Sequence, residues 1–259
     1  MNSEAVTTES STKLEQAVQQ FEGIDLAGLN AVKLMNRIDT KTYFSKDLLY
    51  PLLEQLSKDY YLLDIKGERI AFYKNLYYDT PQLGFYTAHH NRKGNRYKIR
   101  YRQYVSSKLT FFEVKFKSNK GRTIKERIKI PDIAYTIKDT AKDLLEDTTP
   151  LLAKNLTPSI HIDFNRITFA NRDLTERATI DLGLSFKSDL KSHVYDDLVI
   201  CEIKQSSFNS QSLILKALSN LNIPPKRISK YCIGILSCCE GIKYNRFKRK
   251  INQLTNGIY

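Results

Sequence analysis

The sequence lacks long apolar runs and has few cysteines. No apolar run approaches the roughly 18 residues of a membrane-spanning helix, and the opening MNSEAVTTESST lacks the basic and apolar regions of a signal peptide. We therefore expect a soluble, cytoplasmic protein without a membrane span. The four cysteines, Cys201, Cys232, Cys238 and Cys239, do not have the spacing of metal ligands. We expect them to be reduced thiols in the core.

Acidic residues are scarce relative to basic ones. The chain has 28 Asp and Glu against 41 Lys and Arg, which gives a formal net charge of +13. A field of this sign attracts phosphates, nucleic acids and acidic membrane surfaces. The net charge alone does not select among these partners.

The length and composition suit one large domain. The chain has 259 residues, of which 41% are hydrophobic, and we expect a single domain over residues 30–259. Residues 1–29 are expected to be a partly disordered segment with a short helix. The first 12 residues are polar and aperiodic, whereas Leu14, Val18 and Phe21 recur at helical spacing.

Strand patterns dominate the rest of the chain. Runs rich in Tyr, Ile, Val, Phe and Thr predict strands at 34–44, 59–66, 69–78, 95–104, 109–118, 122–131, 158–169, 176–184 and 196–205. Apolar residues every three or four positions predict helices at 46–57, 80–90, 136–146, 209–221 and 229–238. Ser45 is the predicted N-cap of the first of these helices. Short links at 105–108 and 118–121 favour antiparallel hairpins.

Cations alternate with apolar residues along several predicted strands. Successive side chains of a strand point to opposite faces, so residues of one parity share a face. Three successive strands each place cations on one face and apolar residues on the other. The residues that share the charged face are Lys98, Arg100 and Arg102, then Glu113, Lys115 and Lys117, then Lys125, Arg127 and Lys129. Further strands add Arg37, Asp39 and Lys41, then Arg177, Thr179 and Asp181, then Glu202 and Lys204.

An ordinary half-buried sheet would also present a polar face to water. Such a face mixes acids and bases, because like charges repel when they lie opposite each other on neighbouring strands. The acids on this face are few and isolated. We therefore predict that the strands close into a barrel with a basic lumen that binds an anion.

Several segments resemble the VTC-type polyphosphate polymerase domain, a branch of the triphosphate tunnel metalloenzymes that also include CYTH-type triphosphatases. They occur in the order of that family and are MNRIDTKTYF (35–44), YYDTPQLGFYTAH (77–89), YKIRYRQY (97–104), FFEVKFK (111–117), TIKERIKI (123–130), ERATID (176–181), LVICEIK (198–204) and KRISKYCIG (226–234). The resemblance implies an α+β fold in which an eight-stranded antiparallel β-barrel tunnel is surrounded by peripheral helices.

The resemblance also implies an activity, which is transfer of the γ-phosphate of ATP to a growing inorganic polyphosphate chain with Mn²⁺ or Mg²⁺. Two alternatives stay open: hydrolysis of tripolyphosphate or nucleoside triphosphates, and polyphosphate binding without turnover. The first strand reads RIDTK, not the ExExK of the triphosphatase branch, which favours the polymerase. No SPX domain or membrane helix is attached, so coupling to transport need not apply. A membrane-protein partner and the oligomeric state are left open.

A nucleic-acid partner is not expected. Proteins that bind single strands interleave stacking aromatic residues with cations on one face. Here Tyr97 and Tyr101 take the parity opposite to the cations.

The resemblance assigns roles to individual residues. The catalytic set would be Lys41, Arg100, Arg102, Lys115, Lys125, Arg127, Arg177 and Lys230, and further phosphate-binding residues would be Arg37, Lys98, Lys117, Lys204, Arg227 and Ser229. Glu202 would hold the metal, with a counterion of Lys204 as the alternative role. Glu113 is a second metal candidate and could equally be a counterion of a neighbouring lysine. We expect Asp39 and Asp181 to orient arginines, and His89 and His90 to be exposed surface residues.

Overall fold

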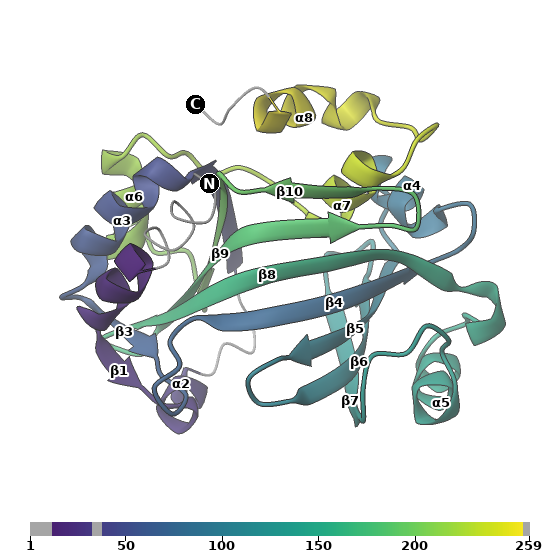
Figure 1. Cartoon of the computed structure of the whole chain (residues 1–259), viewed down its shortest axis with the longest axis horizontal. Coiled ribbons are helices and arrows are strands. Elements are labelled where there is room, and N and C mark those ends of the chain that lie inside the picture. The colour runs from purple at the N-terminus through teal and green to yellow at the C-terminus, as the bar shows by residue number, and fades with distance from the viewer. Residues whose placement is uncertain (1–11, 33–37, 256–259) are drawn as a thin grey trace, which may run out of the picture.

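The computed structural model describes residues 12–32 and 38–255, and an antiparallel sheet forms its centre (Figure 1). The strands along its main path are β2 (Ile38–Ser45), β11 (Leu198–Gln205), β9 (Glu176–Lys187), β8 (Thr157–Asn171), β4 (Ala71–Asp79), β5 (Arg96–Tyr104), β6 (Leu109–Lys117) and β7 (Thr123–Ile130). Short strands β1 (Glu22–Ile24), β3 (Tyr60–Leu63) and β10 (Ser192–Tyr195) join beside β8 and β9. The mixed α+β class and the antiparallel hairpins are confirmed; β1 and β10 were not predicted.

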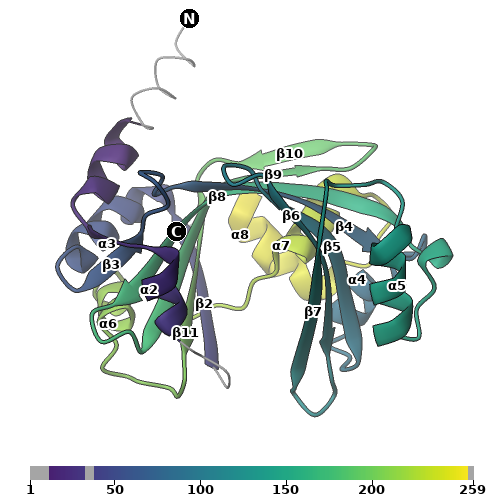
Figure 2. The same cartoon turned by 90° about the horizontal axis from the view of Figure 1, so that it is seen from below.

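The sheet does not close, so the predicted barrel is wrong. Strands β2 and β7 end the path, and among the described residues they are not paired with each other. The sheet curves instead, and β2 stands opposite β7 (Figure 2). At the free edge of β2, the amide of Lys226 donates to the carbonyl of Lys41 at 2.7 Å. Thr42 Oγ1 donates to the carbonyl of Pro224 at 2.7 Å, so the segment before helix α7 (Lys230–Cys238) lies along part of this edge.

The curved sheet has two walls, one that ends in β2 and one that ends in β7. Helices cover the outer side of each wall. Residues 12–19, α3 (Leu49–Leu56) and α6 (Leu213–Asn220) pack on β2, β11, β9 and β8 in one apolar cluster. As predicted, Ser45 caps the turn η1 (Lys46–Leu48) ahead of α3, because its hydroxyl accepts from the amide of Asp47 at 3.3 Å. Helix α5 (Asp139–Thr148) packs on the outer side of β5, β6 and β7.

Helix α7 (Lys230–Cys238) lies on the inner side, between the two walls (Figure 2). It packs with α4 (Gly84–His90) and α8 (Lys248–Thr255) against one end of the central strands. Gly234 permits a close approach, because a Cβ there would lie 2.6 Å from a ring carbon of Phe186. The first residue of α7, Lys230, is thereby directed at the charged face of the sheet.

The remaining elements are short. Helix α2 (Leu26–Ala31) places Leu29 against Ala170 at the other end of β8, and η2 (Ala153–Asn155) and η3 (Asn245–Phe247) are single turns. Strand β1 pairs with β3, so the segment before residue 30 is part of the sheet. Within the described residues, no helix is both long and apolar enough to cross a bilayer.

Candidate anion-binding site

Strand register sets the cations of β5, β6 and β7 side by side on the inner face of the sheet. Lys98, Lys115 and Lys125 are opposite one another on the three strands. In the next row toward the centre of the sheet, Glu113 lies between Arg100 and Arg127. Like charges in direct cross-strand contact are unfavourable. The lysine row is therefore an arrangement that an anion would stabilise.

Glu113 is the buried counterion of this wall. Its side chain is 2% exposed and accepts from Arg100 Nη2 at 2.5 Å and from Lys125 Nζ at 2.5 Å. Burial alone would raise the pKa of Glu113, but Arg100, Arg102 and Lys125 together hold it well below its usual value. Glu113 is thus ionised, with both carboxylate oxygens bound to cations.

Glu202 also binds two cations, on the opposite wall formed by β2 and β11. Its two oxygens lie 2.8 Å from Lys41 Nζ on β2 and 2.8 Å from Lys204 Nζ on β11. Although burial opposes ionisation, the two lysines hold the pKa of Glu202 well below its usual value. The side chain stays 17% exposed, so an incoming ion can reach this carboxylate.

Asp181 joins the wall of β8 and β9 to helix α7. Arg166 binds it with two hydrogen bonds, of 2.5 and 2.7 Å, and Lys230 Nζ contacts the second oxygen. Asp181 therefore orients an arginine, as expected. Burial lowers the pKa of Lys230 to about 8, an effect that Arg166 and Lys41 reinforce and Asp181 opposes. Lys230 is thus held close to two cations of the sheet, Arg166 and Lys41.

Cations of the two walls act on one another. Although Lys115 on β6 is exposed, its pKa is lowered to about 8, because nearby protein atoms displace part of its water and because Lys98 and Lys41 repel its charge. Lys41 belongs to β2, the strand at the far end of the sheet path. The inner faces of both walls and the start of α7 therefore enclose one shared region of positive potential.

Neutral groups fix several of these cations in place. Arg100 Nη1 donates to the Tyr77 hydroxyl at 2.7 Å, and Arg102 Nε donates to Asn75 Oδ1 at 2.8 Å. Lys98 Nζ lies 3.3 Å from Ser229 Oγ, which also caps α7. Burial raises the pKa of Tyr77, but the cations around it outweigh this effect and lower the value to about 8. The cations are therefore positioned before any ligand binds.

The family profile of the VTC domain matches residues 36–239, which is most of the chain. This protein belongs to the VTC-domain family. The resemblance drawn from the sequence is thereby confirmed. Among curated proteins, none matches the sequence.

Solved structures show only distant likeness to this VTC domain. HpAC1 from Hippeastrum, described as an adenylyl cyclase candidate with a dominant triphosphatase activity, is 13% identical with a TM-score of 0.49, over 80% of this chain and 98% of that one. An adenylate cyclase candidate from Vibrio parahaemolyticus is 12% identical with a TM-score of 0.45, over 77% and 98%. The PH1819 protein from Pyrococcus horikoshii is 13% identical with a TM-score of 0.43, over 78% and 99%.

Other predicted residues of the VTC domain lie at the margins of the inner face. Arg177 has its Nη2 bound to the carbonyl of Leu29 in α2 at 2.8 Å, at the end of β9 remote from α7. Lys117 and Arg127 are exposed, and Arg127 lies over the ring of Phe111 at 4.8 Å. Arg227 is exposed just before α7. The predicted residue Arg37 lies outside the described residues.

Sequence reasoning missed three residues that hold this site together: Arg166, Asn75 and Tyr77. On its strand Arg166 follows Phe164 and Ile162 on the same face, so no cationic stripe marked it. Asn75 and Tyr77 lie on β4, which carries no cation on the inner face. Only the pairing of β4 with β5 in the folded chain brings them to the arginines.

The prediction that His89 and His90 are exposed is wrong. His90 is 1% exposed, and its Nε2 accepts from the amide of Arg246 at 3.2 Å. His89 Nδ1 lies 3.1 Å from Cys232 Sγ on α7. Burial, together with the repulsion of Lys98, lowers the pKa of His89 to about 3. The packing of α4 on α7, which the sequence pattern did not reveal, encloses both rings.

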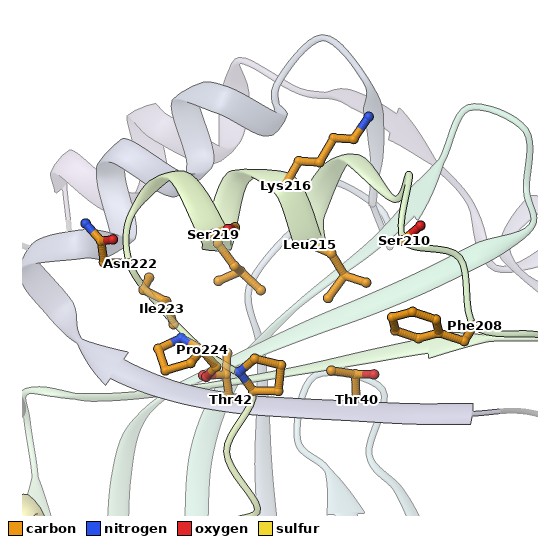
Figure 3. A pocket seen from close by; sticks show the side chains of 12 residues that line it. Thr40, Thr42, Phe208, Ser210, Leu215, Lys216, Ser219, Asn222, Ile223 and Pro224 are labelled. Carbon is orange, nitrogen blue, oxygen red and sulfur yellow. The ribbon is translucent and has the colours of Figure 1, made fainter.

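A cavity of about 770 Å³ lies elsewhere, between the edge of β2 and helix α6 (Figure 3). Thr40 and Thr42 line it, and they take the parity opposite to Lys41, so the cavity is on the outer side of the wall. Leu215, Ile223 and other apolar side chains make up much of its lining. It lacks the charge that a phosphate ligand requires, since Lys216 is the one cation among its lining residues.

The carboxylates of the VTC domain restrict how a metal could bind. Among the described residues, no three side chains of His, Cys, Asp or Glu lie together as a metal cage. A metal held mostly by phosphate oxygens and water needs only one protein carboxylate. Glu202 fits such a role, because it is ionised, partly exposed and flanked by two flexible lysines.

Proposed function

We propose that this VTC domain binds ATP and inorganic polyphosphate on its basic inner face and transfers the γ-phosphate of ATP to the polyphosphate chain. The observation that carries the proposal is the convergence of cations from separate elements on one region. Lys41 comes from β2, Lys115 from β6 and Lys230 from α7, and the charge of Lys41 contributes to lowering the pKa of both Lys115 and Lys230. Such an assembly is unfavourable when empty and is neutralised by a linear polyanion.

Phosphoryl transfer needs positioning and charge stabilisation more than a general base. Arg100 and Arg102 would each present a planar pair of donors to phosphate oxygens, held by Tyr77 and Asn75. The lysines of β2, β6 and α7 would act as point charges on the transferred group. Ser229 would hold Lys98 at the start of α7.

Phosphate would exchange partners with the acidic residues of the inner face. When phosphate oxygens bind Lys41 and Lys204, these lysines release Glu202, which would then hold Mn²⁺ or Mg²⁺ together with the substrate. The metal would neutralise charge on the phosphate oxygens. Glu113 is more enclosed than Glu202 and has both oxygens bound to cations, so we assign it the counterion role.

Product analysis tests the proposal. The protein is incubated with ATP and Mn²⁺, and the phosphate products are separated by chain length. We expect chains that lengthen with time while ADP accumulates in proportion to the phosphate incorporated. Release of inorganic phosphate alone would assign hydrolysis to the same face, and binding of tripolyphosphate without turnover would assign a binding module.

Glu202→Gln tests the metal assignment. The amide keeps the shape of the side chain but loses the charge, so we expect folding and most tripolyphosphate binding to survive while Mn²⁺-dependent turnover is lost. The matched control is Glu126→Gln, an exposed residue on the other face of β7. Turnover near the wild-type rate in Glu202→Gln would show that Glu202 is only a counterion.

A further inference from the structure

A basic segment follows α7, in residues 243–250, and the anion site described above does not include it. Within these eight residues, KYNRFKRK, five are Lys or Arg, and no Asp or Glu occurs from residue 241 to the end of the chain. The side chains of four of them are exposed: Lys243, Arg246, Lys248 and Arg249. The segment also lies beyond residue 239, where the match to the VTC family ends.

The apolar side of this segment is already used. Phe247, Ile251 and Leu254 pack into the cluster that contains α7, so α8 cannot offer an apolar face to a membrane. Its cations form no ion pair with a described carboxylate. An exposed segment with charge of one sign and no ion pairs of its own is typical of polyanion-binding regions.

The segment is continuous with the inner face of the sheet. Lys250 Nζ donates to the carbonyl of Arg227, two residues before Ser229, and Ser229 contacts Lys98. On the opposite wall the Tyr43 hydroxyl of β2 donates to Gln253 of α8 at 2.9 Å. Helix α8 thus contacts β2 directly and reaches the opposite wall through the segment before α7, and it lies beside α7 (Figure 2).

We propose that Lys243, Arg246, Lys248 and Arg249 form an external track for the part of a long polyphosphate chain that extends beyond the inner face. The proposal rests on the proposed function, because it needs a linear phosphate chain at the inner face. A chain longer than that face must leave it, and residues 243–249 offer exposed cations beside the segment before α7, which contacts β2 through Lys226 and β5 through Ser229. Binding to both regions by one chain raises affinity through effective concentration.

The test removes the four exposed cations together, in the variant Lys243→Ala, Arg246→Ala, Lys248→Ala and Arg249→Ala. The control variant removes four exposed lysines that lie on the outer side of the walls: Lys58→Ala, Lys138→Ala, Lys154→Ala and Lys216→Ala. Both variants lose the same charge. Affinity for tripolyphosphate and for long-chain polyphosphate is measured at several salt concentrations, with circular dichroism to confirm folding.

We expect the α8 variant to bind long-chain polyphosphate roughly tenfold more weakly at low salt, with a salt slope lower by roughly 3. Its affinity for tripolyphosphate should stay within about twofold of the wild type, and the control variant should match the wild type with both ligands. Unchanged long-chain affinity in the α8 variant, or an equal loss in the control, would overturn the track.

Two further ligands test whether the four cations bind a different kind of polyanion. Phosphatidylserine vesicles and a single-stranded oligonucleotide are tested against the same variants, and binding of either through the four residues, without a long-chain effect, would also overturn the proposal. If the wild type does not bind tripolyphosphate, the proposed function is wrong and the track fails with it. If tripolyphosphate binds normally and only the long-chain effect is missing, the track alone is wrong.

Discussion

Glu113 is the residue on which the stability of the basic wall depends most. It is buried and binds both Arg100 and Lys125. Removing one partner of a buried ion pair costs about 3–5 kcal/mol, and because Lys125 is 40% exposed we expect Glu113→Gln to lower the free energy of unfolding by about 3 kcal/mol. Urea unfolding of the empty protein measures this loss.

A ligand distinguishes a counterion from a metal ligand at this position. If Glu113 is a counterion, tripolyphosphate replaces its charge, and the Glu113→Gln protein should gain at least as much stability from the ligand as the wild type. Glu126→Gln on the outer face serves as the control and should change neither value. A Glu113→Gln protein as stable as the wild type when empty would contradict the counterion role.

Lys115 should make anion binding depend on pH. Its pKa is about 8 in the empty protein, and a bound polyphosphate raises it, because the anion favours the charged lysine. Binding therefore takes up a proton above pH 8, and affinity is highest below that pH and falls as pH rises. A pKa of 8 leaves about a tenth of the side chains charged at pH 9, so this lysine contributes an affinity loss of about tenfold between pH 7 and pH 9.

Lys115→Arg tests the source of this dependence. An arginine keeps its charge throughout this pH range, so the variant should lose about tenfold less affinity than the wild type between pH 7 and pH 9. Calorimetric titration with tripolyphosphate measures both proteins, and Lys129→Arg on β7 is the matched control. An identical pH profile for wild type and Lys115→Arg would show that the pKa of Lys115 does not govern binding.

At the scale of the element, helix α7 positions Lys230 and Ser229 because Gly234 lets it approach β9. Alanine improves helix propensity by about 1 kcal/mol, but a Cβ at 2.6 Å from Phe186 must displace the helix or the ring, at a cost of about 1–3 kcal/mol. We expect Gly234→Ala to lower the melting temperature and to weaken tripolyphosphate binding without removing any charge.

An exposed helix position gives the control for this change. Ser219→Ala in α6 is an exposed substitution that also introduces the better helix former, so it should raise stability slightly and leave tripolyphosphate binding unchanged. Thermal unfolding followed by circular dichroism, together with calorimetric titration, measures both variants. A Gly234→Ala protein that binds tripolyphosphate like the wild type would show that the position of α7 is not critical for the site.

The elements that the sequence predicts well are those with a strong local period. Alternation in residues 97–130 identifies three strands and the face of each cation, because the period of two is intrinsic to a strand. Closure of the sheet is not a local property, since it depends on how β2 and β7, which are far apart in the sequence, are placed relative to each other. The same limit applies to Arg166, whose partner Asp181 becomes its neighbour only through the pairing of β8 with β9.

The sequence of α8 contains a helical pattern of apolar residues that predicts this helix. Phe247, Ile251 and Leu254 recur at the spacing of one helix face. The many cations around them dominate the composition of this segment, although the apolar positions suffice to pack it on α7. Periodicity within a charged segment is therefore a better guide to helix formation than mean hydropathy.

At the scale of the whole molecule, the curved, open sheet directs cations from both of its walls toward one inner face. The inner face gathers cations from both walls, and its three buried or partly buried carboxylates, Glu113, Glu202 and Asp181, each bind two of them, which leaves an excess of positive charge at every carboxylate. Lys98 and Lys115 lie beside each other in the sheet, and Lys98 contacts the uncharged hydroxyl of Ser229. Close cations of this kind repel by about 1 kcal/mol or more, depending on the effective dielectric.

The measurement that tests this account most directly is the melting temperature with and without tripolyphosphate at low salt. At about a hundred times the dissociation constant, the ligand should add roughly 2.7 kcal/mol of stability, which raises the melting temperature of a chain of this size by a few degrees, and added salt should shrink the effect. The double variant Lys98→Met with Lys115→Met should leave the melting temperature of the empty protein unchanged or raise it, and should remove most of the ligand-induced rise. No shift with tripolyphosphate in the folded wild type at low salt would contradict the anion-binding function proposed for the inner face.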